Sequence, residues 1–203
     1  MNVGRHMQRD AVTALPSATV GTIRRVMEEH GFGLLLIASE DGALRGFVTR
    51  ASLRGVADGE VAVEAVSHPV RFAVQPTDTL EKAALIMLDN RLVLLPVVEG
   101  DRLVGVITQS EVLRGLADGL GIGLVGTRME IKLRKDSDDL FRAFDVLREH
   151  GVHVVSMASR RENETHRDVV LRLQGIADPE ALRLALEAQL REAESPDSMP
   201  DRP

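Results

Sequence analysis

The sequence predicts a mixed α/β (α+β) protein made of two β-α-β-β-α repeats and a smaller ferredoxin-like βαββα unit. Residues 46–53, Gly-Phe-Val-Thr-Arg-Ala-Ser-Leu, return fifty-nine positions later as residues 105–112, Gly-Val-Ile-Thr-Gln-Ser-Glu-Val. Around both segments, helical apolar stripes and short apolar runs follow one another in the same order. After residue 126 another strand-helix-strand-strand-helix series begins with a strand in which apolar and charged residues alternate.

The composition excludes several classes of function. The 203 residues carry a net charge of −6 and are only 2% aromatic, with no Trp, Tyr or Cys. A negative surface opposes binding to duplex nucleic acid, and the shortage of rings argues against stacking of single strands. Disulfides, thiolate metal sites and cysteine nucleophiles are excluded. Residues 1–6 lack an apolar signal core, and no apolar run approaches the roughly 20 residues that span a bilayer. We therefore expect a cytoplasmic protein that binds no nucleic acid and no membrane.

Each repeat begins with a short strand that ends at a proline, followed by an amphipathic helix. The two opening strands, residues 10–16 and 70–76, correspond at an offset of sixty. Apolar residues at i, i+3, i+4 and i+7 spacing then mark one buried helix face. In the second copy, Asp78 and Glu81 are predicted to be the N-cap and its capping partner. The residues of the two stripes are Val20, Ile23 and Met27 in the first copy and Leu80, Ala83, Ala84 and Met87 in the second.

Two strands and a short helix complete each repeat. Asp-Gly between apolar runs is a hairpin signal, and both copies have an acidic and glycine-containing turn at this place. The offset falls from sixty to fifty-nine across the turn, where a change of length disturbs the fold least. We expect the first repeat to occupy residues 1–60 and the second residues 61–120. The predicted strands are 34–38, 44–49, 93–98 and 103–108.

This duplicated pattern resembles the CBS domain, and the tandem pair resembles a Bateman module, over roughly residues 6 to 118. The features that carry the resemblance are the opening 7–13, the helical stripe, the Leu-Pro-Val-Val strand at 95–98 and Gly-x-x-Thr at the end of the third strand. The resemblance implies two copies packed through their sheets about a pseudo-twofold axis. It also implies two clefts that bind adenine nucleotides or related adenosyl compounds.

The same resemblance suggests site residues through the family motif Gly-x-x-Thr/Ser-x-x-Asp. Thr49 and Thr108 match the hydroxyl position, whereas Ser52 and Glu111 stand where the family has the ribose-binding aspartate. Glutamate keeps the carboxylate, so the cleft at Thr108 and Glu111 is preferred to the one at Thr49 and Ser52. The remaining candidates are Arg50 and Arg71 for phosphate, and Leu36 and Pro96 at equivalent strand positions beside the adenine.

A purely structural interpretation of these residues stays open. Thr108-Gln109-Ser110-Glu111 is also a capping box, which stabilises its helix by about 1 kcal/mol without any ligand. Arg50 and Arg71 are equally compatible with solvated surface charges.

The C-terminal third is predicted to hold a glycine-rich linker, a second domain and a tail. Residues 121–126 match G-x-G-x-x-G, but a helix precedes them and a strand follows, so the dinucleotide fingerprint is rejected. In residues 127–190, Gly151 is a helix stop after His150, and Asp178-Pro179-Glu180 starts the last helix. Residues 191–203 are acidic and contain proline, which favours a disordered tail.

Residues 127–190 are similar to an ACT domain. Ser137 and Asp138 stand where that family has the Pro-Gly turn that approaches a bound amino acid. The expected last strand is missing, which leaves an edge strand for pairing with a second copy. Dimerisation is therefore preferred to amino-acid sensing. A CBS pair followed by such a domain resembles the acetoin-utilisation regulatory family.

The predicted function is regulatory and not enzymatic. No P-loop, nucleophile elbow or HExxH motif occurs, and the histidines are scattered. The leading hypothesis is a homodimeric sensor that binds AMP, ADP, ATP or S-adenosylmethionine and acts on an unknown regulated protein. No metal and no permanent cofactor are expected. The alternative is a ligand-free dimerisation scaffold, motivated by the loss of the motif aspartate in both copies.

Overall fold

A computed structural model describes residues 1–161 and 164–192 of the chain, which forms two compact units, Met1–Leu116 and Ala117–Pro203. Each unit is described separately. None of the helices in the described ranges is both long enough and apolar enough to cross a lipid bilayer.

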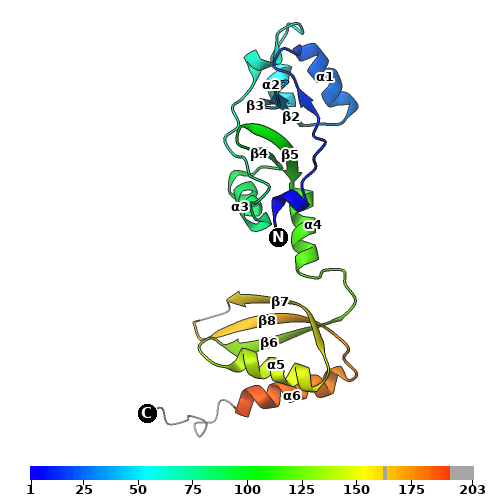
Figure 1. The fold of residues 1–203 in the computed structure, drawn as a ribbon, viewed down its shortest axis with the longest axis vertical. Coiled ribbons are helices and arrows are strands. Elements are labelled where there is room, and N and C mark those ends of the chain that lie inside the picture. Colours follow the sequence, from blue (N-terminus) through cyan, green and yellow to red (C-terminus); the bar gives the residue numbers. More distant parts are fainter. Residues whose placement is uncertain (162–163, 193–203) are drawn as a thin grey trace. The chain divides into compact units, whose positions relative to one another are not determined.

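The first unit contains the two repeats, and the predicted order of strands and helices is confirmed (Figure 1). Strands β1, β2 and β3 form one sheet and β4 and β5 a second, with antiparallel β2–β3 and β4–β5 hairpins. The opening strand of the second repeat is reduced to a single parallel bridge between Val74 and Val97. The elements are η1 (Val3–Arg5), β1 (Thr13–Ala14), α1 (Val20–Glu29), β2 (Leu34–Ala38), β3 (Leu44–Thr49), α2 (Arg50–Arg54), η2 (Val63–Val66), α3 (Leu80–Asn90), β4 (Leu94–Glu99), β5 (Arg102–Thr108) and α4 (Gln109–Gly119).

The helical stripes bury their apolar faces as predicted, but the cap of α3 is not the predicted one. Leu80, Ala83 and Met87 are buried in the core of the second repeat. Thr79, and not Asp78, is the N-cap, since its hydroxyl accepts from the Lys82 backbone N–H at 3.2 Å. Glu81 is therefore one position too early in the helix to serve as the capping partner. The Asp78 carboxylate instead accepts from the backbone N–H of Gln75 at 2.8 Å and from the Lys82 ammonium at 2.7 Å.

Each repeat is completed by the first residues of the other repeat. Gln8 and Val106 exchange backbone hydrogen bonds of 2.8 and 2.9 Å, and their counterparts His68 and Phe47 do the same. Val3 lies in the core around α3, and its counterpart Val63 lies in the core around α1. These reciprocal contacts follow the offsets of sixty and fifty-nine in the sequence. They relate the two repeats by an approximate twofold axis.

The turns of the two hairpins meet at this axis. Ala43 and its own counterpart Arg102 form an antiparallel bridge. Beside it, Leu44 donates to the Asp101 carbonyl and Leu103 donates to the Gly42 carbonyl, both at 2.9 Å. Because a residue on a twofold axis must contact its own equivalent, the bridge marks where the axis passes.

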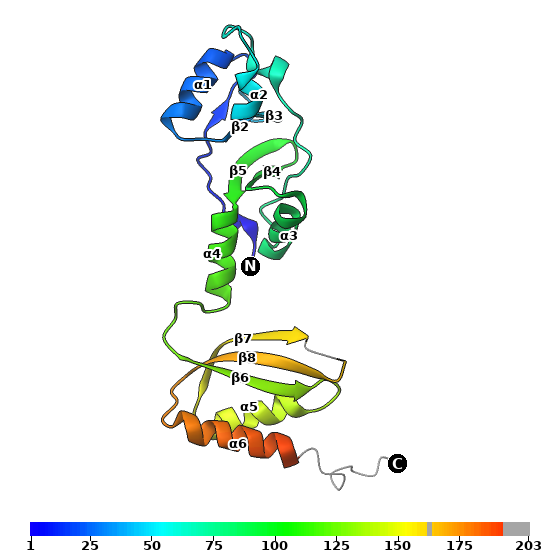
Figure 2. The same cartoon turned by 180° about the vertical axis from the view of Figure 1, so that it is seen from behind.

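The second unit is a three-stranded antiparallel sheet with both helices on one face (Figures 1 and 2). The order β6-β8-β7 is that of the first three strands of a ferredoxin-like fold, as predicted. Among the described residues, no strand pairs with the outer edge of β6. The elements are β6 (Thr127–Arg134), α5 (Asp139–Glu149), β7 (His153–Arg161), β8 (His166–Gln174) and α6 (Pro179–Glu192).

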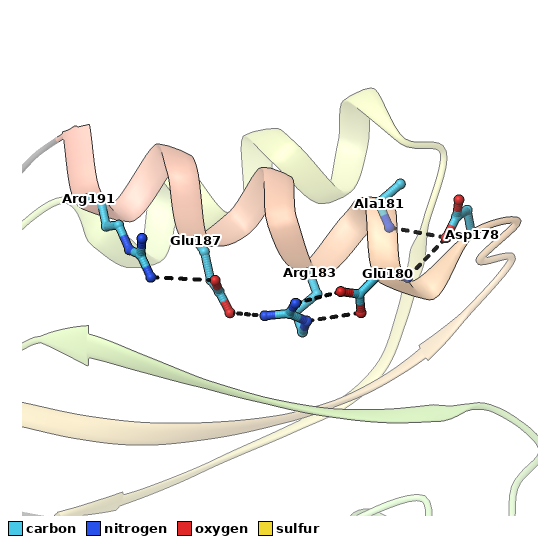
Figure 3. A network of polar contacts seen from close by, with 6 residues as sticks. All are labelled: Asp178, Glu180, Ala181, Arg183, Glu187 and Arg191. Atoms are coloured by element: carbon cyan, nitrogen blue, oxygen red, sulfur yellow. Dashed lines mark hydrogen bonds and ion pairs between the residues drawn. The ribbon is translucent and has the colours of Figure 1, made fainter.

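The last helix starts where the sequence predicts and ends slightly later. The Asp178 carboxylate accepts from the backbone N–H groups of Glu180 and Ala181, both at 3.0 Å (Figure 3). Arg183 bridges Glu180 and Glu187 along the exposed side of α6. The helix includes residues 191 and 192, which were assigned to the tail; residues 193–203 lie outside the described residues.

A buried ion pair joins the end of β6 to the start of α5. Arg134 donates two guanidinium hydrogen bonds, of 2.6 and 3.0 Å, to the Asp139 carboxylate, which is only 2% exposed. The Arg134 backbone N–H adds a third bond at 2.9 Å. Hydrogen bonding by Arg134, first of all by its side chain, holds the pKa of Asp139 below its usual value despite burial. The Arg134–Asp139 pair therefore holds the end of β6 against the start of α5.

Candidate functional site

A cavity of about 330 Å³ lies where the two repeats meet. Strands β2 and β3 of the first repeat contribute to its walls, together with residues 68–72 and β4 of the second. Its volume is at the lower end of the range for small-molecule sites. The lining residues are Leu34, Leu36, Phe47, His68, Pro69, Val70, Arg71, Phe72, Leu92, Leu94 and Pro96.

The walls of this cavity are mostly apolar, and two of its side chains carry the polar chemistry. Leu36 and Pro96, the two strand positions predicted from the sequence, are both buried and both line it. Arg71 also lines it, as the predicted phosphate partner would, and is exposed to solvent. His68 packs against Phe47 with ring centroids 5.5 Å apart and planes tilted by 45°. The cavity thus offers flat apolar surfaces together with a cationic group.

The first threonine motif forms a complete capping box. The Thr49 hydroxyl accepts from the Ser52 backbone N–H at 3.1 Å, and the Ser52 hydroxyl accepts from the Thr49 backbone N–H at 3.0 Å. Neither residue lines the cavity, but Leu34, the strand partner of Thr49, does. Thr49 and Ser52 therefore stabilise the start of α2. They lie close to the cavity, because Thr49 pairs with Leu34 in the sheet.

In the second threonine motif, the Glu111 carboxylate is hydrogen-bonded by Thr108 and by Gln8 of the first repeat. The Glu111 carboxylate accepts from the Thr108 hydroxyl and, at 2.9 Å, from the Thr108 backbone N–H. Its other oxygen accepts from the Gln8 side-chain amide at 2.8 Å. Burial by itself would raise the pKa of Glu111, but these hydrogen bonds outweigh it and hold the pKa below the usual value. The carboxylate is thus satisfied by groups of the chain itself.

Arg50 lies apart from the cavity lining. Its guanidinium donates to the carbonyl oxygens of Phe32 at 2.7 Å and Met27 at 3.1 Å. Met27 lies in the last turn of α1, where its carbonyl also accepts from the Phe32 backbone N–H at 2.9 Å, and Phe32 lies in the turn that follows. In this structure Arg50 therefore secures a helix end. Of the eight predicted site residues, the cavity brings together Leu36, Arg71 and Pro96.

Each Gly-x-x-Thr motif needs its glycine because a backbone carbonyl of the other repeat lies against it. A Cβ at Gly105 would lie 2.5 Å from the Gln8 carbonyl oxygen, and a Cβ at Gly46 would lie 2.8 Å from the His68 carbonyl oxygen. Both distances are shorter than real Cβ contacts. The two glycines therefore admit the segment that each repeat receives from the other, a role that sequence reasoning did not assign to them.

Sequence reasoning also missed Phe47, His68 and Phe72 in the cavity lining. Phe47 and Leu36 are register partners on β3 and β2, so strand pairing could have placed them on the same face. His68 reaches the cavity because it pairs with Phe47 across the two repeats. That pairing has no local signal in the sequence.

The second unit has separate cavities. One of about 320 Å³ lies between β6 and α6 and is lined by Ile131, Arg183 and Leu186 among others. Ser137, at the predicted amino-acid-binding turn, lines another of about 150 Å³ with Phe141 and Met157. The Ser137 hydroxyl donates to the Arg134 carbonyl at 3.1 Å and accepts from the Asp139 backbone N–H at 3.3 Å.

Two curated relatives match the N-terminal part of the chain. An uncharacterized protein of Methanopyrus kandleri is 29% identical over 122 residues, which are 56% of this chain and 62% of the relative. The inosine-5'-monophosphate dehydrogenase of Korarchaeum cryptofilum is 34% identical over 106 residues, 51% of this chain but only 22% of that enzyme. The chain therefore spans less than two thirds of the length of both.

Three solved structures resemble this chain over a little more than half of its length. The putative acetoin utilization protein AcuB from Vibrio cholerae is 26% identical, with a TM-score of 0.54, covering 60% of this chain and 94% of that one. A CBS domain pair/ACT domain protein from Thermotoga maritima has the same identity and TM-score, covering 59% and 99%. The cytosolic domain of the Mg²⁺ channel MgtE, solved with ATP, is 27% identical with a TM-score of 0.51, covering 56% and 48%.

The family model described as "CBS domain" matches the chain twice, at residues 3–59 and 63–118. Together the two matches cover more than half of the sequence and coincide with the two repeats of the first unit. The duplicated fold, the reciprocal segments and this double match lead to the same conclusion, that the chain belongs to the CBS-domain family as a tandem pair.

Proposed function

We propose that the chain is a regulatory protein that senses an adenine nucleotide or adenosyl compound in the cleft between its two CBS repeats. The observation that carries this proposal is the cavity of about 330 Å³, because its lining comes from both repeats. A ligand seated there touches both halves of the pair. Its binding energy can therefore depend on how the halves are arranged, which is the physical requirement for a sensor.

The lining residues suggest where the base and the phosphate of such a ligand bind in the cavity. The base lies against the apolar walls near Leu36 and Pro96, where a flat ring gains from desolvation. Arg71 binds phosphate, since its planar guanidinium can donate two parallel hydrogen bonds to phosphate oxygens. Among the four candidates, this favours AMP, ADP and ATP over S-adenosylmethionine, which has no phosphate.

The ATP complex of the MgtE cytosolic domain supports this ligand class by analogy. That domain shares 27% identity and the fold with this chain. The inference from it concerns the chemical class of the ligand, and the residues that bind it here are assigned from this chain's own cavity.

A second position at Thr108 and Glu111 is proposed as the weaker one. A ribose could reach the Glu111 carboxylate only by displacing the hydrogen bonds from Gln8 and Thr108. Replacing hydrogen bonds that already exist yields little net free energy. Occupation of this position would instead release Gln8 and, with it, the first residues of the first repeat from the second.

The proposal assigns dimerisation to the ACT-like second unit and the regulated activity to a separate protein. Within residues 1–161 and 164–192 no strand pairs with the outer edge of β6, which supports pairing with a second copy. The turn at Ser137 is closed by its own hydrogen bonds, which makes amino-acid sensing the less favoured role.

Isothermal titration of ligand-free protein with AMP, ADP, ATP, S-adenosylmethionine and adenosine tests the nucleotide proposal. Arg71→Ala should weaken the nucleotides about tenfold to a hundredfold, as expected for a hydrogen bond to a charged group, and leave adenosine unchanged. Arg25→Ala is the matched control, because Arg25 is exposed on α1 and does not line the cavity. Absence of heat and of any melting shift with all five compounds at millimolar concentration would contradict the proposal.

The second candidate function is a ligand-free dimerisation scaffold. It is favoured by the capping box of Thr49 and Ser52 and by the hydrogen bonds that Thr108 donates to Glu111, because in both motifs the residues satisfy one another. It predicts that Thr108→Ala lowers stability without changing any binding. Mass spectrometry of denatured, freshly purified protein decides between the two functions, since a co-purified adenine compound is incompatible with a ligand-free scaffold.

A further inference from the structure

Three ring-bearing side chains line the nucleotide cavity in addition to its aliphatic residues and its arginine. They are Phe47, His68 and Phe72, and we call them the ring set. The chain has only five phenylalanines and no Trp or Tyr, so two of its five phenylalanine rings lie around this one cavity. Such a concentration favours a flat aromatic ligand, since aromatic rings attract one another beyond the gain from burial alone.

Backbone contacts between the repeats hold two of these rings in place. Phe47 and His68 exchange backbone hydrogen bonds of 2.9 and 2.8 Å, and their ring centroids lie 5.5 Å apart. Phe72 is 38% exposed, so a ligand can reach its ring from solvent. Two rings are thus positioned before a ligand arrives, which lowers the entropy cost of binding.

The internal repeat shows how the second position, at Thr108 and Glu111, differs from this cavity. Leu36 and Pro96 are counterparts of each other, so these two strand residues cannot distinguish the positions. The ring set, however, is not repeated, and neither is the arginine. The counterparts of Phe47, His68, Arg71 and Phe72 are Val106, Gln8, Ala11 and Val12.

The side chains of His68 and Gln8 also have different partners. The Gln8 amide donates to the Glu111 carboxylate at 2.8 Å. Ser52, the counterpart of Glu111, exchanges hydrogen bonds with Thr49 instead. The His68 ring is therefore left to pack against Phe47 and to line the cavity.

Two differences between the positions act in the opposite sense. Phe32 stands in place of Leu92, but its ring stacks on His30 with centroids 5.2 Å apart and packs against the core of the first repeat. Arg9 stands in place of Pro69, but its guanidinium donates to the Gly4 carbonyl at 3.3 Å. The next residue, Asp10, has the opposite charge. Both added groups are thus already in contact with other parts of the chain.

We infer that Phe47, His68 and Phe72 bind the base of the ligand and confine nucleotide binding to this cavity, so that each chain binds one nucleotide when the cavity is saturated. The inference rests on the proposed function and adds base-binding residues and a stoichiometry to it. A base in the cavity is enclosed by the apolar strand residues and by rings that stack on its faces. The second position offers the same strand residues without the ring set.

Isothermal titration of the full-length, ligand-free chain with AMP and with adenosine tests this inference. Each compound should bind once per chain. His68→Gln combined with Phe72→Val, which installs the residues of the second position, should weaken AMP and adenosine alike by about tenfold or more, as expected for lost base stacking. Arg71→Ala should weaken AMP alone. Circular dichroism should show unchanged folding of the double variant, because both replaced residues are exposed.

The matched control changes the counterpart of Phe72. Val12 is 44% exposed and does not line the cavity. Val12→Ala should therefore leave both affinities and the stoichiometry unchanged. A loss of AMP affinity in Val12→Ala equal to that in the double variant would place the nucleotide at the second position and overturn the inference.

Proton nuclear magnetic resonance of the unchanged chain gives a measurement that does not depend on variants. The base protons of bound AMP should show cross-relaxation with phenylalanine ring protons, which no Trp or Tyr signals obscure. Two AMP molecules per chain, an unchanged affinity of the double variant, or no cross-relaxation with a phenylalanine ring overturns the inference and leaves the proposed function standing. Absence of heat with both compounds refutes the two together.

Discussion

Gly105→Ala tests whether residues 1–8, at the start of the first repeat, are an integral part of the second. The new Cβ would lie 2.5 Å from the Gln8 carbonyl oxygen, at least 0.5 Å inside the 3.0 Å below which such contacts are essentially never seen. If the segment moves away, the two Gln8–Val106 hydrogen bonds are lost, at about 1 kcal/mol each. If it stays, overpacking costs about 1–3 kcal/mol. The expected loss of unfolding free energy is therefore about 2–3 kcal/mol.

Urea denaturation followed by far-ultraviolet circular dichroism measures this loss, because the chain has no Trp or Tyr for fluorescence. Gly46→Ala is the internal comparison, with a longer approach of 2.8 Å and a correspondingly smaller loss. Gly55→Ala is the control, since nothing lies within 4 Å of its Cβ and its φ of −77° suits alanine. A loss below about 0.5 kcal/mol for Gly105→Ala, or a larger loss at Gly55 than at Gly105, would refute the reasoning.

Three further predictions concern charged groups. The folded-state pKa of Glu111 is depressed, so its ionised form stabilises the fold above the ordinary carboxylate range, and that stability is lost as the pH falls through the folded pKa. Glu111→Gln should therefore flatten the acid side of a plot of urea midpoint against pH below about pH 5, and an unchanged slope would contradict the assignment. Asp139→Asn should destabilise the second unit by about 2–4 kcal/mol in urea, because it leaves Arg134 without its buried counter-ion; a change under about 1 kcal/mol would show that the pair is dispensable. Asp178→Ala should cost about 1 kcal/mol by removing the cap of α6, whereas Asp178→Asn should restore most of it in the same assay.

Local sequence patterns predicted the elements of this fold well because each element buries one periodic face. The error at the start of α3 shows the limit of such patterns, since Asp78 and Thr79 are both good N-caps. Comparison of the repeats resolves the choice. The counterpart of Thr79 is Thr19, which caps α1 by accepting from the Thr22 backbone N–H, whereas the counterpart of Asp78 is Ala18.

The candidate site was only partly predictable, because its geometry depends on pairing between distant segments. Leu36 and Pro96 were predicted through the resemblance to the CBS domain, which places equivalent strand positions of the two copies beside the adenine. His68 enters the cavity through its pairing with Phe47, which no periodicity reveals. The preference for Glu111 came from its charge alone. Its hydrogen bond from Gln8, 103 positions away, could not be read from that charge.

The reciprocal segments also have a consequence for synthesis of the chain. Residues 1–8 leave the ribosome long before β5 and α4, the elements on which they fold. At about 5–20 residues per second, the 103 positions between Gln8 and Glu111 correspond to a delay of roughly 5–20 s. During this interval Val3 and Met7, both core residues of the finished second repeat, have no place to pack. The first repeat can close on residues 61–68 within the delay, so the nascent protein has one folded repeat while residues 1–8 still lack the partner on which they pack.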